Sequence, residues 1–124
     1  MHLTVAGSSP QNRRGGQVSH LLLSPGQFGS AHLAITFVEC DPASEQPMHS
    51  HPEAEQVYVI VSGNGLMRVD DEEQEVGAGA LIFIPPGAKH AIRNASSKPL
   101  TYVSATSPPF RMPEQGSVFA YTHP

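Results

Sequence analysis

The chain has 124 residues, enough for one domain with its own hydrophobic core and too few for a second domain of ordinary size. Its formal net charge of −4 comes with no basic patch, which argues against a nucleic acid as the main partner. Cys40 is the single cysteine and excludes an intramolecular disulfide. Neither a signal-peptide pattern nor an apolar stretch of membrane-spanning length is present, so we expect a cytoplasmic protein without a membrane partner.

Short apolar runs alternate with turns along the whole chain, which contains twelve prolines and eleven glycines. Residues 1–19 are polar and turn-rich, and predict an arm or an edge strand of the single domain 1–124. No helical periodicity of ten or more residues is present, so the pattern predicts an all-β fold, a closed barrel or jelly roll of about eight antiparallel strands. Strands are expected at 20–24, 31–40, 56–62, 66–70, 80–85 and 100–108, with 31–40 a clearer pattern than 20–24.

Alternation along these runs predicts which side chains are buried. The segment 80–85 is apolar throughout and is expected in the core, whereas the acidic run 70–75 is expected at a solvated hairpin tip. Cys40, at the end of a strand, is interpreted as a small apolar filler. Four aromatic residues are expected in the core: Tyr58, Phe83, Tyr102 and Phe110. Four histidines without a spacing partner are expected at the surface or at an edge: His2, His20, His32 and His123.

Two histidines stand two positions apart in the stretch "MHSHPEAEQ". In an extended strand, His49 and His51 project from the same face, with their backbones about 7 Å apart. That geometry allows two imidazoles to converge on one ion. Alone it is a weak indication, because histidine pairs are also common at surfaces.

A third histidine follows the apolar run 80–85. Pro85 and Gly87 predict a sharp turn after that strand, which places His90 at the start of the next one. If the preceding strand belongs to the core, His90 is directed inward. The sequence thus predicts that a third imidazole arrives from a separate strand.

The spacing of these residues resembles the two sequence motifs of the cupin superfamily, G-x5-H-x-H-x(3,4)-E-x6-G and G-x5-P-x-G-x2-H-x3-N. The second motif is matched at Gly79, Pro85, Gly87, His90 and Asn94. The first is matched at His49, His51 and Gly63 and departs at two places: Ala43 stands where the leading glycine is expected, and the acidic position is ambiguous. The resemblance covers residues 43–94. It implies a double-stranded β-helix, the small jelly-roll barrel of this superfamily.

The resemblance also implies one divalent first-row metal, held by His49, His51 and His90 through neutral imidazole nitrogens. Imidazole suits Mn, Fe, Co, Ni, Cu and Zn, so the ligand type does not choose the metal. The other interpretation is a cupin that has lost its metal and only binds a sugar or a small acid.

The fourth ligand position has two candidates, Glu55 and Gln56. Three residues separate His51 from Glu55, and six separate Gln56 from the hairpin glycine Gly63. A loop absorbs a one-residue change in length, whereas a one-residue slip in a strand moves every side chain to the opposite face. We therefore predict Gln56 as the ligand, unless a β-bulge restores Glu55.

An amide oxygen would leave the full charge on the ion, which makes it a stronger Lewis acid towards an enolate or a carboxylate. Glu55 would then remain available as a proton shuttle, and Tyr58, directed inward with Gln56, is the second candidate for proton transfer. Both are our candidates for catalytic residues.

The resemblance leaves two functional classes open. The first is an enzyme that acts on a small oxygenated organic molecule, of an oxidoreductase (dioxygenase), isomerase, lyase or cyclase type, since fold does not choose among them. The second is a module that binds a small ligand without turnover. We also expect a homodimer, because the apolar strand 20–24 would otherwise be an exposed edge.

Overall fold

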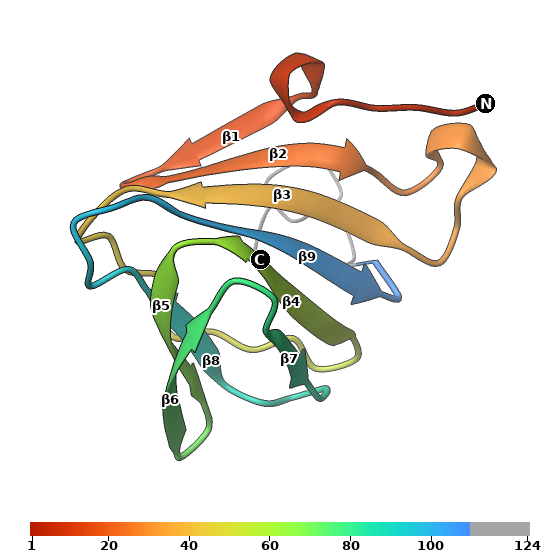
Figure 1. Cartoon of the computed structure of the whole chain (residues 1–124). Helices are drawn as coiled ribbons and strands as arrows, with labels where there is room; N and C mark the ends of the chain where they lie inside the picture. The colour runs from red at the N-terminus through yellow and green to blue at the C-terminus, as the bar shows by residue number, and fades with distance from the viewer. Residues whose placement is uncertain (110–124) are drawn as a thin grey trace.

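The structure is a computed structural model that describes residues 1–109, and almost all of its regular structure is antiparallel β-sheet (Figure 1). No α-helix occurs among these residues, which contain two short 3-10 turns, η1 (Ala6–Ser8) and η2 (Gln27–Gly29). The strands are β1 (Gln11–Arg14), β2 (Gln17–Leu23), β3 (Ala34–Cys40), β4 (Glu55–Ser62), β5 (Asn64–Val69), β6 (Glu72–Gly77), β7 (Leu81–Ile84), β8 (His90–Arg93) and β9 (Leu100–Ser107). Within the described part, no helix is long and apolar enough to cross a membrane.

Two sheets pack face to face and share one core. The larger has six strands in the order β1-β2-β3-β9-β4-β7, and the smaller has three in the order β6-β5-β8. Val38, Tyr58 and Tyr102 from the large sheet pack in one buried cluster with Met67 and Ile92 from the small sheet. This arrangement confirms the predicted all-β class and fits a double-stranded β-helix.

Alternating side chains decide which face of each strand enters this core. In β3, Thr36 and Val38 are buried while Phe37 between them is only partly covered, as the sequence pattern predicts. In β4, Tyr58 and Ile60 are buried in the same way. The acidic run 70–75 is exposed along its whole length at the β5–β6 hairpin, as predicted.

A glycine is required where β4 turns into β5. Gly63 has φ +83, a conformation that L side chains rarely adopt, and a Cβ there would lie 2.3 Å from the carbonyl oxygen of Pro99. The turn brings the end of β4 against the start of β9. This close approach gives a physical reason for the last glycine of the first motif.

Two sequence expectations about burial are wrong. Strand β2 contains residues 20–23 of the segment 20–24, but it lies between β1 and β3 and is not an edge. Strands β1 and β7 are the edges of this sheet, and the apolar side chains of β7 are not all in the core, since Leu81 is 61% and Phe83 51% exposed. Apolar composition alone did not show that β7 has a covered face and an open one. The predicted core position of Phe110 lies outside the described residues.

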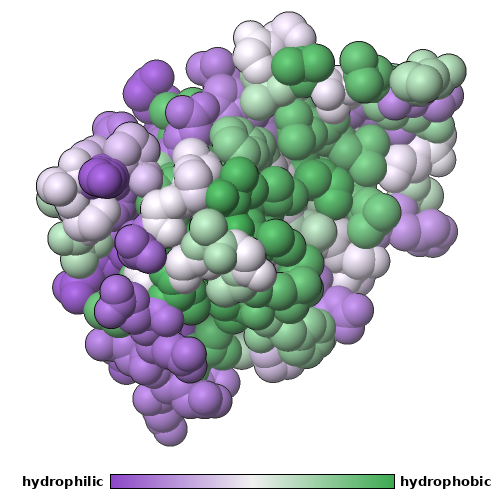
Figure 2. All heavy atoms as spheres, in the orientation of Figure 1, coloured by the Kyte–Doolittle hydropathy of each residue, from purple (hydrophilic) through white to green (hydrophobic). Residues whose placement is uncertain are grey.

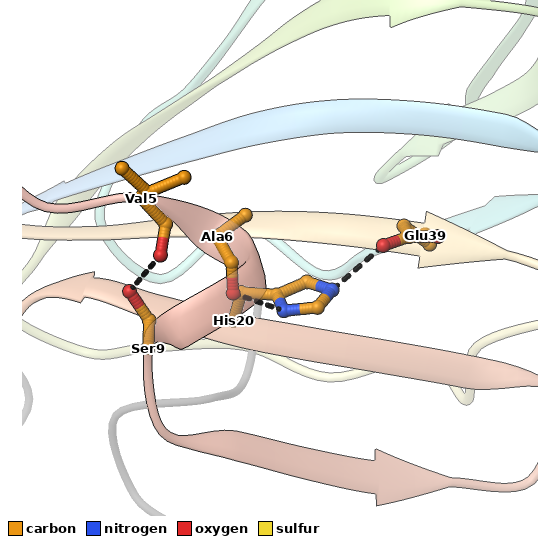
Figure 3. Close-up of polar contacts among 5 residues, drawn as sticks. All are labelled: Val5, Ala6, Ser9, His20 and Glu39. Carbon is orange, nitrogen blue, oxygen red and sulfur yellow. Dashed lines mark hydrogen bonds and ion pairs between the residues drawn. The ribbon is translucent and has the colours of Figure 1, made fainter.

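The expectation that His20 lies at the surface is also wrong. His20 is 5% exposed and sits under the N-terminal arm (Figure 3). Its Nδ1 lies 3.0 Å from the carbonyl oxygen of Ala6, and its Nε2 lies 2.7 Å from the carboxylate of Glu39. His20 therefore anchors the arm to β2 and β3.

Asn94, the last residue of the second motif, has a structural role. Its amide nitrogen donates to the carbonyl oxygens of Cys40, Asp41 and Lys98, at 2.7 to 3.2 Å. Its amide oxygen accepts from the backbone and the hydroxyl of Ser96. The side chain is fully buried and joins the loop after β8 to the end of β3.

Candidate metal site

His49 and His90 face each other across two extended segments. Each donates its backbone N–H to the other's carbonyl oxygen, at 3.0 and 2.8 Å, as in a hydrogen-bonded antiparallel pair. Side chains of such a pair lie on the same face of the sheet, and the two imidazole centroids are 4.2 Å apart. The backbone therefore holds the first and third histidines of the two motifs side by side.

His51 is held by the turn that precedes β8. The Gly87 N–H donates to the His51 carbonyl oxygen at 2.8 Å, and Gly87 itself has φ +81. The His51 ring centroid lies 5.1 Å from that of His49 and 5.5 Å from that of His90. The Pro85–Gly87 turn thus positions two histidines, one through its backbone and one at the strand that follows it.

Hydrogen bonds to the backbone select the tautomer of two rings. His49 Nδ1 lies 2.8 Å from the carbonyl oxygen of Pro47, and His90 Nδ1 lies 3.0 Å from that of Ala88. A carbonyl accepts only, so each Nδ1 carries the proton and the lone pair is on Nε2. This is the tautomer in which histidine binds a metal through Nε2 while Nδ1–H fixes the ring orientation.

The three histidines fit a metal ion. One ligand nitrogen from each lies within 4.8 Å of the other two, with His90 buried and the other two partly exposed. Nitrogens bound at about 2.1 Å to one ion are roughly 3–3.5 Å apart. The imidazole nitrogens would therefore move closer to one another by about an ångström when they bind one ion. The donor set suits a divalent transition metal, whose identity it does not decide.

Glu55 and Gln56 lie on opposite faces of β4. Gln56 is 2% exposed on the inner face, whereas Glu55 is exposed. Pairing of β4 with β7 and β9 is regular from Gln56 to Val59, and the register shift recorded in β4 comes later, between Ile60 and Ser62. No bulge therefore turns Glu55 inward at this point.

The side-chain amide of Gln56 has a hydrogen-bond partner for its nitrogen but none for its oxygen among the described residues. Its nitrogen donates to Ser104 Oγ at 2.9 Å, while its buried oxygen has no hydrogen-bond partner among the described residues. A buried acceptor without a partner is costly unless something else binds it. This is the property expected of a ligand oxygen, and the assignment of Gln56 as fourth ligand stays a prediction.

Tyr58 lies one step deeper on the same face of β4. Its ring packs edge-on against His90, with centroids 6.0 Å apart, and its hydroxyl donates to the amide oxygen of Gln46 at 3.5 Å. Burial raises the pKa of Tyr58 far above its ordinary value, so the hydroxyl keeps its proton. Tyr58 is therefore a hydrogen-bond donor in this structure, and its part in proton transfer stays a prediction.

Gln46 is a residue that the sequence reasoning missed. Its side-chain oxygen accepts from the Tyr58 hydroxyl and also from the Ile92 N–H at 3.3 Å, and these two contacts fix the orientation of the amide. Its position three residues before His49 was the available signal. Ser104, the partner of Gln56, was missed because nothing in β9 alone indicates which strand it faces.

Comparison with known proteins now identifies the family. Residues 36–106, more than half of the chain, match the cupin domain. The chain belongs to the cupin family. The matched range includes His49, His51 and His90 as well as Gln56, so it covers the whole candidate site.

Related cupins come from several organisms. The uncharacterized protein MJ1618 of Methanocaldococcus jannaschii is 31% identical over 101 residues, which cover 82% of this chain and 81% of that protein. The tetracenomycin polyketide synthase protein TcmJ of Streptomyces glaucescens is 27% identical over 116 residues, covering 94% and 77%. The crystal structure of a Thermotoga maritima protein described as a predicted oxalate decarboxylase superposes with a TM-score of 0.76 at 19% identity, covering 86% and 98%, and it supports the fold alone.

Proposed function

We propose that this cupin is a metal-dependent enzyme acting on a small oxygenated organic molecule. The observation that carries the proposal is the convergence of His49, His51 and His90, with two of the rings held in the tautomer that suits ligation. A divalent ion at this position supplies Lewis acidity towards an oxygen of the substrate. Dioxygenase, isomerase, lyase and cyclase reactions all remain within the proposal.

The inside of the barrel supports an oxygenated, weakly charged substrate. Among the described residues, the buried polar side chains are histidine, glutamine, asparagine, serine and threonine, with no Lys, Arg, Asp or Glu. A negative charge on the substrate would therefore be neutralised mainly by the ion, and its other oxygens would meet amide and hydroxyl groups. The relation to a polyketide synthase protein agrees with such a substrate class.

Each chain residue has a proposed part. The three histidines, with Gln56 as the fourth ligand, hold the ion, and Tyr58, whose hydroxyl donates to the amide oxygen of Gln46, is proposed for proton transfer together with Glu55. Glu55 is proposed as the group that exchanges protons with solvent. Because Glu55 lies on the outer face of β4, it can act on a bound substrate only through a relay.

The second candidate function is a module that binds a small organic acid or a sugar without turnover. Exchangeable water on the ion would favour the enzyme, while an ion with all its positions taken by the protein would favour the module. We expect a small-molecule ligand, no nucleic-acid or membrane partner, a homodimer and a cytoplasmic location.

The test is metal analysis of untagged protein, followed by alanine replacement of each histidine. His49→Ala, His51→Ala and His90→Ala are expected to lose most of the bound metal while their circular dichroism stays that of a β-protein. His32→Ala, at an exposed histidine outside the group, is the matched control and should keep its metal. Stoichiometric metal in the triple variant would refute the site, and turnover of enolic or phenolic substrates by the loaded protein distinguishes the enzyme from the binding module.

A further inference from the structure

Strands β6 and β7 follow each other in the chain but belong to different sheets. Strand β6 is an edge of the small sheet and β7 is an edge of the large one, and the turn 78–80 joins them (Figure 1). Between these two strands lies a cleft with a volume of about 450 Å³, which we call the β6–β7 cleft. Sites for small molecules have volumes of about 300–1,000 Å³. None of the four candidate metal ligands lines this cleft, so it is a separate site.

The floor of the β6–β7 cleft is apolar. Val69, Val76 and Ile82 line it and pack against the core that the two sheets share, yet each is only partly buried. Leu81 and Phe83 also line the cleft, and both are more than half exposed. An apolar ligand would therefore remove from water a surface that the chain itself leaves open.

The hairpin of β5 and β6 supplies an acidic rim. Five of the six residues 70–75 are acidic, and two of them, Asp70 and Glu72, line the cleft. Alternation along β6 places Glu72, Gln74 and Val76 on one face, so the carboxylate stands at one end of the strand and the apolar side chain at the other. In the space-filling view, the hydrophilic area over this hairpin adjoins a hydrophobic area where Figure 1 draws β7 (Figure 2).

The negative charge of this rim is not balanced by the protein. Neither Asp70 nor Glu72 forms an ion pair with another residue of the described part of the chain, and no described Lys or Arg lines the cleft. Arg68 lies on the other face of β5 and donates to the backbone carbonyl oxygen of Asp70 at 3.2 Å. The Asp70 carboxylate accepts the backbone N–H of Lys89 at 3.0 Å, a neutral donor. The rim therefore attracts cations to the cleft.

We propose that the β6–β7 cleft binds a small organic cation, with an aromatic or alkyl body and a protonated amine. The body would lie on Val76 and Ile82, and the ammonium group would lie beside Glu72. Charge complementarity decides the class of ligand: the rim repels an anion, a neutral apolar molecule leaves both carboxylates without a partner, and an inorganic cation leaves the apolar floor uncovered. The proposal goes beyond the proposed function and does not depend on the metal.

Three probes with the same ring system test the charge and the apolar body separately. They are 1-naphthylmethylamine as the cation, 1-naphthylmethanol as the neutral molecule and 1-naphthylacetate as the anion. The chain has no tryptophan, so naphthalene fluorescence reports binding with little overlap from the protein. We expect one amine to bind per chain, about tenfold more tightly than the alcohol, and no binding of the anion. Added salt should weaken binding of the amine and leave that of the alcohol unchanged.

Substitutions on the two faces of β6 provide matched controls. Glu72→Gln should weaken binding of the amine by about fivefold and leave that of the alcohol unchanged. Glu73→Gln, at the neighbouring exposed residue that does not line the cleft, should change neither by more than about twofold. Asp70 is not replaced, because its carboxylate also holds the backbone of Lys89 beside His90.

A second pair of variants tests the cavity itself. Gln74→Phe places a ring in the cleft and should block the amine and the alcohol alike, whereas Glu73→Phe, on the other face, should block neither. Both positions are exposed, so both variants should fold.

Several results would overturn the proposal. Absence of saturable amine binding up to about 5 mM would mean that the polar side chains of β6 only keep its free edge from pairing. Equal affinity for the amine and the alcohol, or equal effects of Glu72→Gln and Glu73→Gln, would contradict recognition of the charge. Displacement of the amine by an equimolar amount of calcium would make the rim a site for an inorganic cation.

The same titration separates this proposal from the proposed function. His49→Ala, His51→Ala and His90→Ala are expected to bind the amine as the unmodified chain does, whatever their metal content. Loss of amine binding in all three variants would place the probe at the histidines and overturn the separate site.

Discussion

Neighbouring residues in the chain have opposite environments at Glu55 and Gln56. A strand places consecutive side chains on opposite faces, so one is exposed and the other is buried beside Ser104. Their chemistry differs as well, since a carboxylate would neutralise one charge of the ion and an amide would not.

Replacement at these two positions separates the candidates for the fourth ligand. Gln56→Ala is expected to weaken metal binding by about 1–3 kcal/mol, the scale of a lost interaction with a charged partner. Glu55→Gln should leave metal affinity nearly unchanged and lower only turnover. Affinities measured by competition with a chelator check both, and the opposite pattern would mean that β4 shifts its register when the metal binds.

The hydroxyl of Tyr58 is expected to position Gln46 rather than to take protons. Burial raises the pKa of its phenol and so favours the neutral hydroxyl, whose proton is directed at the Gln46 oxygen. Tyr58→Phe should therefore keep the metal and raise KM several-fold, with a smaller change in kcat. The pH at which activity rises should stay the same. The free energy of unfolding should fall by about 1 kcal/mol, the scale of one buried hydrogen bond. Loss of kcat alone, by 100-fold or more, would instead make Tyr58 a proton donor in the reaction.

At the scale of elements, the turns hold the candidate ligands in place, and one of these turns is strained. Ala43 stands where the first cupin motif has glycine, and its φ is +63. This left-handed conformation costs an L-residue roughly 1–2 kcal/mol. Ala43 thus holds a conformation that glycine would adopt without this cost.

Ala43→Gly should relieve this strain. Part of the gain is offset because glycine has more freedom in the unfolded chain, so we expect a net stabilisation of about 0.5–1 kcal/mol. Urea unfolding measures it. Ala78→Gly, also in an exposed turn but without a positive φ, is the control and should destabilise the protein; equal effects of the two variants would contradict the strain.

At the scale of the whole molecule, the shared core links stability to alkaline pH through Cys40. Burial raises the pKa of its thiol from 9.0 to about 12, a shift that Asp41 reinforces and a hydrogen bond with Gln17 opposes. The folded state thus holds the proton where the unfolded state releases it. The contribution of this thiol to the free energy of unfolding is complete below about pH 9 and is lost as the pH rises towards 12.

The unfolding free energy should therefore fall above pH 9 by up to about 1.4 kcal/mol per pH unit from this group. Cys40→Ala should be less stable at neutral pH, because a buried side chain is shortened, but should show a shallower loss between pH 9 and 10. Urea titrations at a series of pH values check this. Parallel slopes for the two proteins would show that the thiol is not the titrating group.

The sequence by itself determined the all-β class, the cupin motifs and the group of three histidines. These features are local, because a period of two marks a strand, and Pro85 and Gly87 mark a turn whatever lies nearby. It also predicted the burial of Gln56, because the side-chain period is counted from the turn at Gly63. Here local geometry was sufficient.

Only the tertiary structure decided what covers each face. Strand β7 and the segment 20–24 have similar apolar composition, yet one is an open edge and the other lies inside the sheet. His20 is buried because the arm folds over it, and Gln46 meets Tyr58 across 12 positions in sequence. Such contacts depend on which strands become neighbours, and the alternation within one strand carries no information about its neighbours.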